Sequence, residues 1–188
     1  MKIFLIRHGE TTGDLEERYG GDYDDHLTDR GMKQAEALAD NLRNNNIERI
    51  FTSPRIRARE TSQIVANNLS VPVEVVEDLR ERNAYGVLTG MTKAEASERY
   101  PKEVESLIDY SSNIAGAEKY EDFKSRVINI FGELCHRPLN TIAIITHGGV
   151  VRCFTREVLK LGEFKSLGDC AIIELDMGKI TSLDNAKL

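Results

Sequence analysis

The sequence predicts an α/β sandwich with a largely parallel central sheet, formed as a single domain over residues 1–188. Short apolar runs typical of buried strands alternate with segments whose apolar residues recur at helical spacing. In this architecture ligands bind beyond the carboxyl ends of the strands. Two of the four histidines, His8 and His147, fall at such ends, so we expect the functional site there.

The first half of the chain predicts three strands and two helices. The expected elements are a strand over 2–6, a loop over 9–26, a helix over about 29–45, a strand over 48–52, a helix after Ser53-Pro54 and a strand over 73–76. Thr28 is the expected N-cap of the first helix. Ser53 is the expected N-cap of the second helix, with Pro54 in its first turn.

The second half predicts three helices and three strands. The expected elements are a loop over 78–91, helices near 92–100 and 119–135, a strand over 141–146, a helix over 150–159, and strands over 171–175 and 179–183. Met177-Gly178 is expected to join the last two strands.

The composition predicts a soluble globular protein. Hydrophobic residues make up 40% and charged residues 30% of the chain. A net charge of -6 argues against a nucleic-acid or anionic-membrane partner, since both favour basic surfaces. Three widely spaced cysteines indicate neither a disulfide framework nor a metal site, and the apolar run over 3–6 is too short for a signal segment. We expect a cytoplasmic protein.

Arg7-His8-Gly9 is the first candidate functional motif. A neutral imidazole is a competent nucleophile toward phosphorus, and Gly9 allows another group to approach its backbone closely. The guanidinium of Arg7 suits phosphate oxygens. From the tripeptide alone, a chance polar pair at a strand exit is an equally good interpretation.

Two further motifs indicate an anion site. Arg57 and Thr61 are four residues apart near a helix start, and His147-Gly148-Gly149 lies between a strand and a helix. Taken singly, the arginines are more often a solvated basic face, and His147 is as readily a buried structural histidine. Glu81 is a candidate general acid if its pKa is raised, although a glutamate between two arginines is more often a surface ion pair.

Together and in this order, the motifs resemble the histidine phosphatase superfamily, also called the phosphoglycerate mutase-like family. The resemblance extends from Arg7 to Arg152. The segments that carry it are Arg7-His8-Gly9-Glu10-Thr11, Leu27-Thr28 with Gly31 and Gln34-Ala35, Ser53-Pro54 with Arg57-Ala58 and Thr61, and Thr146-His147-Gly148-Gly149 with Val151-Arg152. It implies a three-layer α/β/α sandwich with a mostly parallel sheet.

The resemblance also implies the chemistry. His8 would attack phosphorus and become a phosphohistidine, while Arg7, Arg57 and His147 would surround the transferred phosphoryl group. Glu81 would serve the leaving group as general acid and then water as base. The other expected phosphate contacts are Thr11, Asp14 and Gly148. No metal is expected, because fixed cations would neutralise the phosphoryl charge.

Three positions depart from the family pattern. Asp14 replaces an asparagine that usually binds phosphate, and a carboxylate there would repel the anion unless it is protonated or turned away. His26 replaces a common proline, so it either reaches the cleft or shapes the loop. The step from Glu81 to Gly86 is one residue longer than usual, so a different turn must place Glu81.

Two enzymatic activities fit the resemblance. The favoured one is a metal-independent phosphatase acting on a small phosphorylated metabolite, because the segment from Gly86 to about Tyr120 is short for a mutase. The alternative is a phosphoglycerate mutase with 2,3-bisphosphoglycerate as cofactor, favoured by the stretch from Gly86 to Tyr100. A non-catalytic phosphate-binding module is the third hypothesis. A monomer and a homodimer both remain open.

Substrate identity is expected to depend on segments 10–26 and 83–120, at the mouth of the pocket. Their candidate contact residues are Arg18, Tyr19, Tyr23, His26, Arg82, Asn83 and Tyr85. Arginine and histidine there would suit a second acidic group on the substrate, and tyrosines would pack on a ring. Any one of them is as readily an ordinary surface residue.

Overall fold

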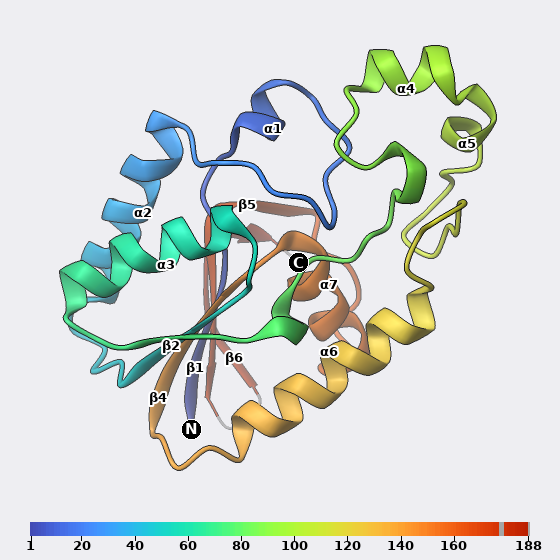
Figure 1. Ribbon diagram of the computed structural model, residues 1–188. Helices are drawn as coiled ribbons and strands as arrows, with labels where there is room; N and C mark the ends of the chain where they lie inside the picture. The colour runs from blue at the N-terminus through green and yellow to red at the C-terminus, as the bar shows by residue number, and fades with distance from the viewer. Residues whose placement is uncertain (177–178, 188) are drawn as a thin grey trace.

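A six-stranded sheet in the order β3-β2-β4-β1-β5-β6 forms the centre of the computed structural model, which describes residues 1–176 and 179–187 (Figure 1). Its strands are β1 (Lys2–Arg7), β2 (Arg49–Thr52), β3 (Val73–Val75), β4 (Thr141–Thr146), β5 (Ser166–Asp176) and β6 (Lys179–Lys187). The first four strands pair with one another in parallel. Pairing with β5 and β6 is antiparallel, which makes the sheet mixed.

The antiparallel edge follows from a short connection. Only two residues separate β5 from β6, and a link of that length joins antiparallel strands, whereas parallel strands need a long crossover. The expected turn at Met177-Gly178 lies outside the described residues. Both strands are longer than predicted, because their outer halves carry polar residues that conceal the strand pattern.

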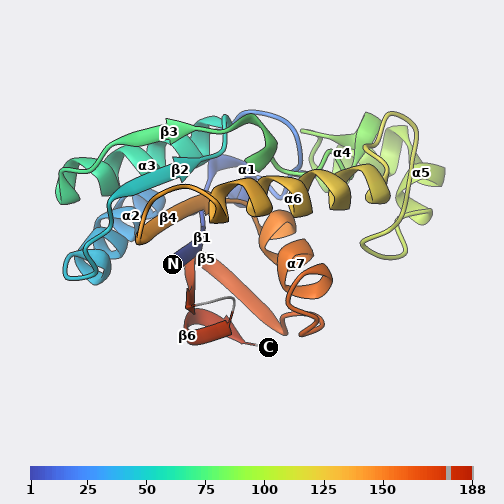
Figure 2. The ribbon, with the colours of Figure 1, turned by 90° about the horizontal axis from the view of Figure 1, so that it is seen from below.

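Helices cover both faces of the sheet, which confirms the three-layer α/β/α sandwich. Helices α2 (Asp29–Leu42) and α3 (Ile56–Leu69) pack on one face, and α6 (Tyr120–Cys135) and α7 (Gly148–Glu157) pack on the other. In Figure 2, α2 and α6 lie on opposite sides of β1. Both faces of β1 are therefore buried, which explains its continuous apolar run.

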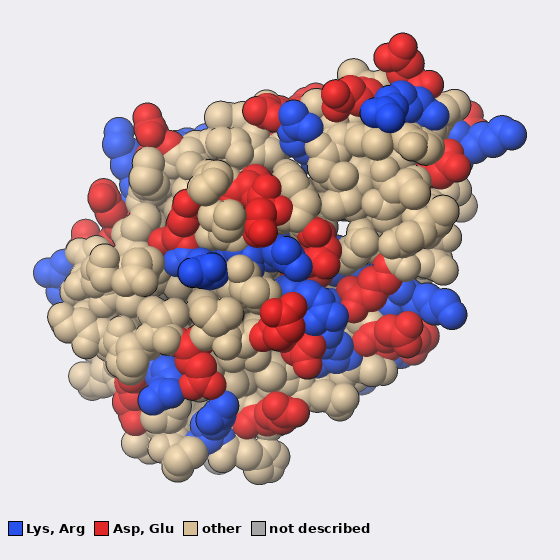
Figure 3. Space-filling model, viewed as in Figure 1, with Lys and Arg blue, Asp and Glu red and all other residues tan. Residues whose placement is uncertain are grey.

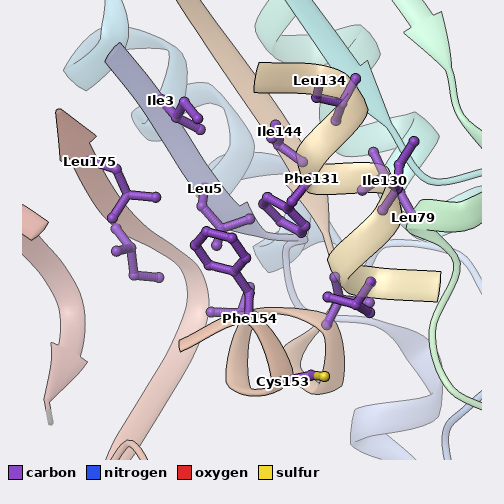
Figure 4. Packing of buried hydrophobic residues seen from close by; sticks show 14 of the residues in the cluster. Ile3, Leu5, Leu79, Ile130, Phe131, Leu134, Ile144, Cys153, Phe154 and Leu175 are labelled. Atoms are coloured by element: carbon purple, nitrogen blue, oxygen red, sulfur yellow. The ribbon is translucent and has the colours of Figure 1, made fainter. Parts of the chain in front are cut away.

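The larger core cluster lies between the sheet and the pair α6 and α7. The rings of Phe131 and Phe154 stack there with centroids 4.0 Å apart, and Leu5 and Ile144 reach them from the sheet (Figure 4). Phe4 and Ile6, which alternate with Ile3 and Leu5, belong to the cluster on the opposite face. This two-sided packing holds the ends of β1 and β4 in register, from Lys2 with Thr141 to Arg7 with Thr146.

The predicted N-cap of α2 is confirmed and that of α3 is wrong. The hydroxyl of Thr28 accepts a hydrogen bond from the Gly31 amide at 2.9 Å, as a cap does. Helix α3 begins later than expected, with Arg55 at its N-cap position. The Ser53 side chain accepts from the Arg55 amide and lies 2.7 Å from Nε2 of His147, so it serves a histidine on a neighbouring strand end.

Short helices occupy the segments that were predicted as loops. Helix α1 (Thr12–Leu15) interrupts the segment 9–26, and the 3-10 turns η1 (Glu77–Leu79) and η2 (Gly86–Leu88) interrupt 78–91. Helix α4 (Lys93–Arg99) is close to prediction, whereas α5 (Pro101–Glu105) was not predicted. Too few residues form α1 and α5 to show helical periodicity. Figure 1 shows α1, α4 and α5 beyond the carboxyl ends of the parallel strands.

Within residues 1–176 and 179–187, no helix combines the length and the apolar character that a membrane crossing requires.

Candidate active site

A cavity of about 390 Å³ opens where neighbouring parallel strands end. His8 directly follows β1 and His147 directly follows β4, which is its neighbour in the sheet. Segments far apart in sequence complete the wall. The predicted residues that line the cavity are Arg7, His8, Thr11, Asp14, Arg57, Glu81 and Gly148. His147 lies immediately behind, with its ring centroid 5.1 Å from that of His8.

The hydrogen bonds of His8 define which nitrogen is free to react. Nδ1 lies 2.8 Å from the carbonyl oxygen of Gly9, and a carbonyl only accepts, so Nδ1 carries the proton. Nε2 then holds the lone pair and accepts from Nε of Arg57 at 3.2 Å. Burial first, and then the charges of Arg57 and Arg7, lower the pKa of His8 well below its usual range. The imidazole is therefore neutral at neutral pH.

The backbone around His8 requires glycine. A Cβ atom on Gly9 would stand 2.7 Å from the carbonyl oxygen of Gly31, at the start of α2. Helix α2 can therefore approach the strand end only because Gly9 has no side chain. This confirms the expectation of a close approach, and the approaching group is protein backbone.

Arg57 is held in place by the loop that precedes α2. It is 4% exposed, and Nη1 donates to the Tyr23 carbonyl at 2.7 Å and to Asp25 at 2.9 Å. Nη2 donates to the Gly21 carbonyl at 3.0 Å. Asp25 is itself buried, so the two side chains form a buried ion pair. Sequence reasoning missed Asp25, although the acidic stretch from Asp22 to Asp25 was an available signal.

Arg7 carries two acidic neighbours. Nη1 donates to the Leu167 carbonyl at 2.9 Å, and Nη2 lies 3.2 Å from Asp169 and 3.8 Å from Asp14. Burial raises the pKa of Asp169 against the opposing effect of Arg7. Sequence reasoning missed Asp169 because β5 was predicted to begin two residues after it.

The Asp14 side chain forms its hydrogen bonds within the first turn of α1. Its Oδ2 atom accepts from the amide and from the hydroxyl of Thr11, each at 2.9 Å, while the Thr11 hydroxyl accepts from the Asp14 amide. This reciprocal pair is a capping box. Thr11 and Asp14 therefore line the cavity with their polar atoms already bonded to each other. Their expected phosphate contacts stay predictions.

His147 is fully buried, and one of its ring nitrogens has no hydrogen-bond partner among the described residues. Nε2 lies 2.7 Å from the Ser53 hydroxyl, whose oxygen already accepts from the Arg55 amide, so the hydroxyl proton is free to bond Nε2. When the hydroxyl donates to Nε2, Nδ1 carries the ring proton, and Nδ1 has no partner within the described part of the chain. Burial, followed by Arg57 and His8, lowers the pKa of His147 well below its usual range. The orphaned donor suits an acceptor such as a phosphate oxygen.

Glu81 is anchored at the start of α7. Its Oε2 atom accepts from the Gly149 amide at 2.9 Å, and Oε1 accepts from the Arg82 amide at 2.8 Å. A Cβ atom on Gly149 would meet Oε1 of Glu81 at 2.3 Å, so only glycine admits the carboxylate there. The sequence-based alternative of a surface ion pair is wrong, since Glu81 lines the cavity and bonds to backbone amides.

The mouth of the cavity is partly as predicted. Arg18, Tyr23, Arg82 and Tyr85 line it, whereas Tyr19 packs against the ring of Tyr85 with centroids 5.0 Å apart. His26 is exposed and lies 2.7 Å from Glu60, which raises the pKa of the imidazole, so this histidine shapes the loop. Asn83 bonds to the Gly116 carbonyl and the Gly86 amide.

Several lining residues were not predicted. They are Tyr110, Tyr120, Arg152, Arg156, Glu163 and Leu167. Arg156, Glu163 and Leu167 lie after the last motif and Tyr120 is the first residue of α6, so no spacing pattern connects them to His8. Figure 3 shows basic and acidic side chains interspersed over the face that it presents, so the cavity arginines do not extend into a broad basic surface there.

Within the described residues, no group of three or more His, Cys, Asp or Glu side chains is arranged to hold a metal ion. The cations placed at the cavity are the guanidinium groups of arginines, among them Arg7, Arg57 and Arg152.

Comparison with known proteins agrees with this geometry. The family model of the histidine phosphatase superfamily (branch 1) matches residues 3–183. A metal-independent phosphoserine phosphatase of Arabidopsis thaliana is 29% identical over 80% of the chain. A 2,3-bisphosphoglycerate-dependent phosphoglycerate mutase of Cytophaga hutchinsonii is 30% identical over 94% of the chain and 84% of its own length. The solved structure of YhfR from Bacillus stearothermophilus superposes with a TM-score of 0.84 at 26% identity, covering 98% of this chain and 96% of that one.

Some relatives are longer than the matched region. The chain spans 66% of the length of the Arabidopsis protein. It spans 31% of a 6-phosphofructo-2-kinase/fructose-2,6-bisphosphatase of Gallus gallus, to which it is 36% identical over 80% of its own length.

Proposed function

Because the chain belongs to the histidine phosphatase superfamily, we propose that it hydrolyses the phosphate monoester of a small metabolite through a phosphohistidine at His8. One observation carries the proposal. The lone pair of His8 Nε2 lies beside Nε of Arg57 at the cavity, in an imidazole that burial keeps neutral. A neutral, oriented imidazole next to a cation suits nucleophilic attack on a phosphoryl group.

In the first step, Nε2 of His8 attacks phosphorus and the bond to the ester oxygen breaks. As the Nε2–P bond forms, positive charge develops on the ring, and the Gly9 carbonyl oxygen that accepts from Nδ1 stabilises it. Before this attack, Arg57 Nε must exchange its bond to His8 for a bond to a phosphoryl oxygen, because Nε2 accepts with the same lone pair that attacks. We assign two further donors to these oxygens: Arg7, which lines the cavity, and Nδ1–H of His147, which lies behind His8 without a partner among the described residues.

Glu81 is the proposed proton carrier. In its acid form it gives a proton to the departing alkoxide, so that an alcohol leaves. The resulting carboxylate takes a proton from water as that water attacks phosphorus, which breaks the Nε2–P bond and returns His8 to its neutral state. Its position beside Gly149 places it at the helix start next to the His147 strand end.

The proposed reaction uses no metal ion, and we propose that the enzyme acts in the cytoplasm. Arg7 and Arg57 supply fixed positive charge where phosphoryl-transfer sites often place magnesium. The three cysteines are free thiols, which suits a reducing compartment. Activity measured with a chelator present tests the first statement, and full inhibition would contradict it.

The decisive experiment compares wild type with His8→Ala. Release of phosphate from p-nitrophenyl phosphate and from a panel of sugar phosphates, phosphoglycerates, nucleotides and phosphoamino acids is measured. We expect hydrolysis by wild type alone, and an acid-labile phosphate on His8 that mass spectrometry detects after rapid quenching. Equal inactivity of both proteins on every compound would end the proposal, and so would turnover by wild type without a phosphorylated His8.

A mutase is the second candidate, because the Cytophaga relative matches most of the chain and of its own length. It shares the first step and differs in the acceptor, which is a second hydroxyl in place of water. Interconversion of 3- and 2-phosphoglycerate, with and without 2,3-bisphosphoglycerate, separates the two. No interconversion would remove the mutase. A non-catalytic phosphate-binding module is removed by any phosphorylated His8.

A further inference from the structure

Two arginines of α7 line the same cavity as His8. Arg152 and Arg156 are four residues apart, so they lie on one side of the helix, and both line the cavity. Burial, followed by the charges of Arg7 and Arg156, lowers the pKa of the Arg152 guanidinium. Hydrolysis of a simple phosphate monoester at His8 leaves this pair without a role.

Glu163 lies against both arginines. Its carboxylate is 3.5 Å from Nη1 of Arg152 and pairs with Nη1 of Arg156, and it lines the same cavity. The chain itself thus presents a carboxylate to two cations inside the ligand cavity.

The backbone on either side of Glu163 is anchored, but its side chain is not. The Leu161 amide donates to the Thr155 carbonyl at 3.1 Å, and Phe164 is buried in the main core. The Phe164 carbonyl accepts from Arg152 at 2.8 Å. The Glu163 side chain is 44% exposed, so rotation about its own bonds removes the carboxylate from the arginines without moving the loop.

Charge compensation alone does not account for Glu163. Glu157 already pairs with Arg156 at 3.1 Å and is held by the Tyr120 hydroxyl at 2.7 Å, and it is absent from the described cavity lining. The Arg156 guanidinium also lies 3.7 Å from the ring centroid of Tyr110 and donates from Nε to Tyr120. Arg156 is therefore held by Glu157, Tyr110 and Tyr120, and Glu163 is a further anion that, unlike Glu157, is among the described residues that line the cavity.

We propose that Arg152 and Arg156 form a subsite for a second acidic group of the substrate, and that Glu163 occupies this subsite until such a group displaces it. The inference rests on the proposed function, since it assigns the substrate class of the same cavity. The substrate is a phosphate monoester that carries a carboxylate or a second phosphate. Glu163 is then a selectivity residue, because a ligand without that group cannot replace it.

The test compares Glu163→Gln with Glu157→Gln. Both variants remove one negative charge beside Arg156, but only the first removes it from the cavity. The substrate pairs are 3-phosphoglycerate with glycerol 3-phosphate, which differ by a carboxylate, and fructose 1,6-bisphosphate with fructose 6-phosphate, which differ by a phosphate. The measured quantity is the ratio of kcat/KM within each pair.

We expect Glu163→Gln to raise the ratio about five-fold for at least one pair, through a lower KM for the more acidic member. Glu157→Gln should leave both ratios, and its kcat/KM for p-nitrophenyl phosphate, as in wild type. Unchanged ratios in Glu163→Gln, an equal rise in Glu157→Gln, or a higher KM for the acidic members would overturn the subsite. The substrate pair whose ratio rises shows whether the second acidic group is a carboxylate or a phosphate.

Binding measurements distinguish a failure of the subsite from a failure of the proposed function. Calorimetric titration of the same compounds into wild type and Glu163→Gln reports the subsite whether or not turnover occurs. Tighter binding of the acidic member to the variant, with no hydrolysis of any compound, would contradict the proposed function and support the subsite. Hydrolysis with no difference in binding would contradict the subsite alone. Melting temperatures check folding, and Glu163→Ala serves as a second variant.

Discussion

Nε of Arg57 donates to Nε2 of His8 over 3.2 Å, inside a region where both side chains are almost fully buried. The contact holds the proton on Nδ1 and the lone pair on Nε2, and it keeps the imidazole neutral. Tyr23, Asp25 and Gly21 accept from Nη1 and Nη2 of the same guanidinium. Because Arg57 engages the Nε2 lone pair, a phosphoryl group that reacts with His8 must take over the Nε bond.

Asp25→Asn should destabilise the protein and misplace Arg57. Asp25 forms a buried ion pair with Arg57, and removal of one partner leaves a buried charge uncompensated. We expect the free energy of unfolding to fall by about 3 kcal/mol, measured by urea denaturation, with a lower kcat for aryl phosphate. Asp40→Asn is the control, because the pair of Asp40 with Arg43 is exposed, and it should change stability by less than about 0.5 kcal/mol. Equal effects of the two substitutions would contradict this role of Asp25.

Stability should fall in mildly acidic solution because His8 and His147 are held neutral. Their pKa values are lowered in the folded state, so only the unfolded chain gains protons as pH drops below about 6.5. Both histidines are neutral in both states well above that pH, so their effect appears only on acidification. Between about pH 7 and pH 5.5, each should remove about 1.3 kcal/mol from the free energy of unfolding. His26, with a raised pKa, acts in the opposite direction.

Urea denaturation at the two pH values measures this effect. Over the same pH interval, the free energy of unfolding of His8→Asn should fall by about 1.3 kcal/mol less than that of wild type. The variant lacks one of the two histidines whose pKa is lowered in the folded state. An identical pH dependence in wild type and His8→Asn would show that His8 is not held neutral by the fold.

Glu81→Gln should slow the hydrolysis of alkyl esters more than that of aryl esters. A glutamine cannot give a proton to an alkoxide, whereas p-nitrophenolate leaves without one. We expect kcat for an alkyl phosphate to fall by about 10²- to 10⁴-fold and that for p-nitrophenyl phosphate to fall far less. Steady-state assays on the two substrate types check this. A uniform loss would show that Glu81 only orders the start of α7, through its bond to Gly149.

Gly149→Ala should reproduce the Glu81 defect without touching Glu81. The new methyl group would lie 2.3 Å from Oε1 of Glu81, so the carboxylate must move away. The same preference for aryl over alkyl phosphates should appear in kcat. Gly132→Ala in α6 is the control, because no atom lies within 4 Å of its added Cβ. That variant should keep full activity and gain about 1 kcal/mol of stability from helix propensity, measured by urea denaturation.

The predictable part of the fold follows from local patterns. Strands β1 and β4 are buried on both faces, so their residues form apolar runs that are visible in the sequence. The first half of β5 and the last four residues of β6 are rich in polar residues and were missed for that reason. Ser53 precedes a proline and a helix, which is the usual setting of a cap, yet its hydroxyl serves His147 because β2 and β4 end side by side.

By itself, the sequence determined the order of strands and helices, the family, and the set His8, Arg57 and His147 at the strand ends. These depend on short-range periodicity and on motifs whose residues are close in the chain. Only the tertiary structure decided the partners: Asp25 for Arg57, Asp169 for Arg7, and Glu163 for Arg152 and Arg156. The chain holds 25 basic and 31 acidic residues, and their order in the sequence does not show which basic residue pairs with which acidic one. Folding alone selects which of them are buried together, and burial gives a pairing its energetic weight.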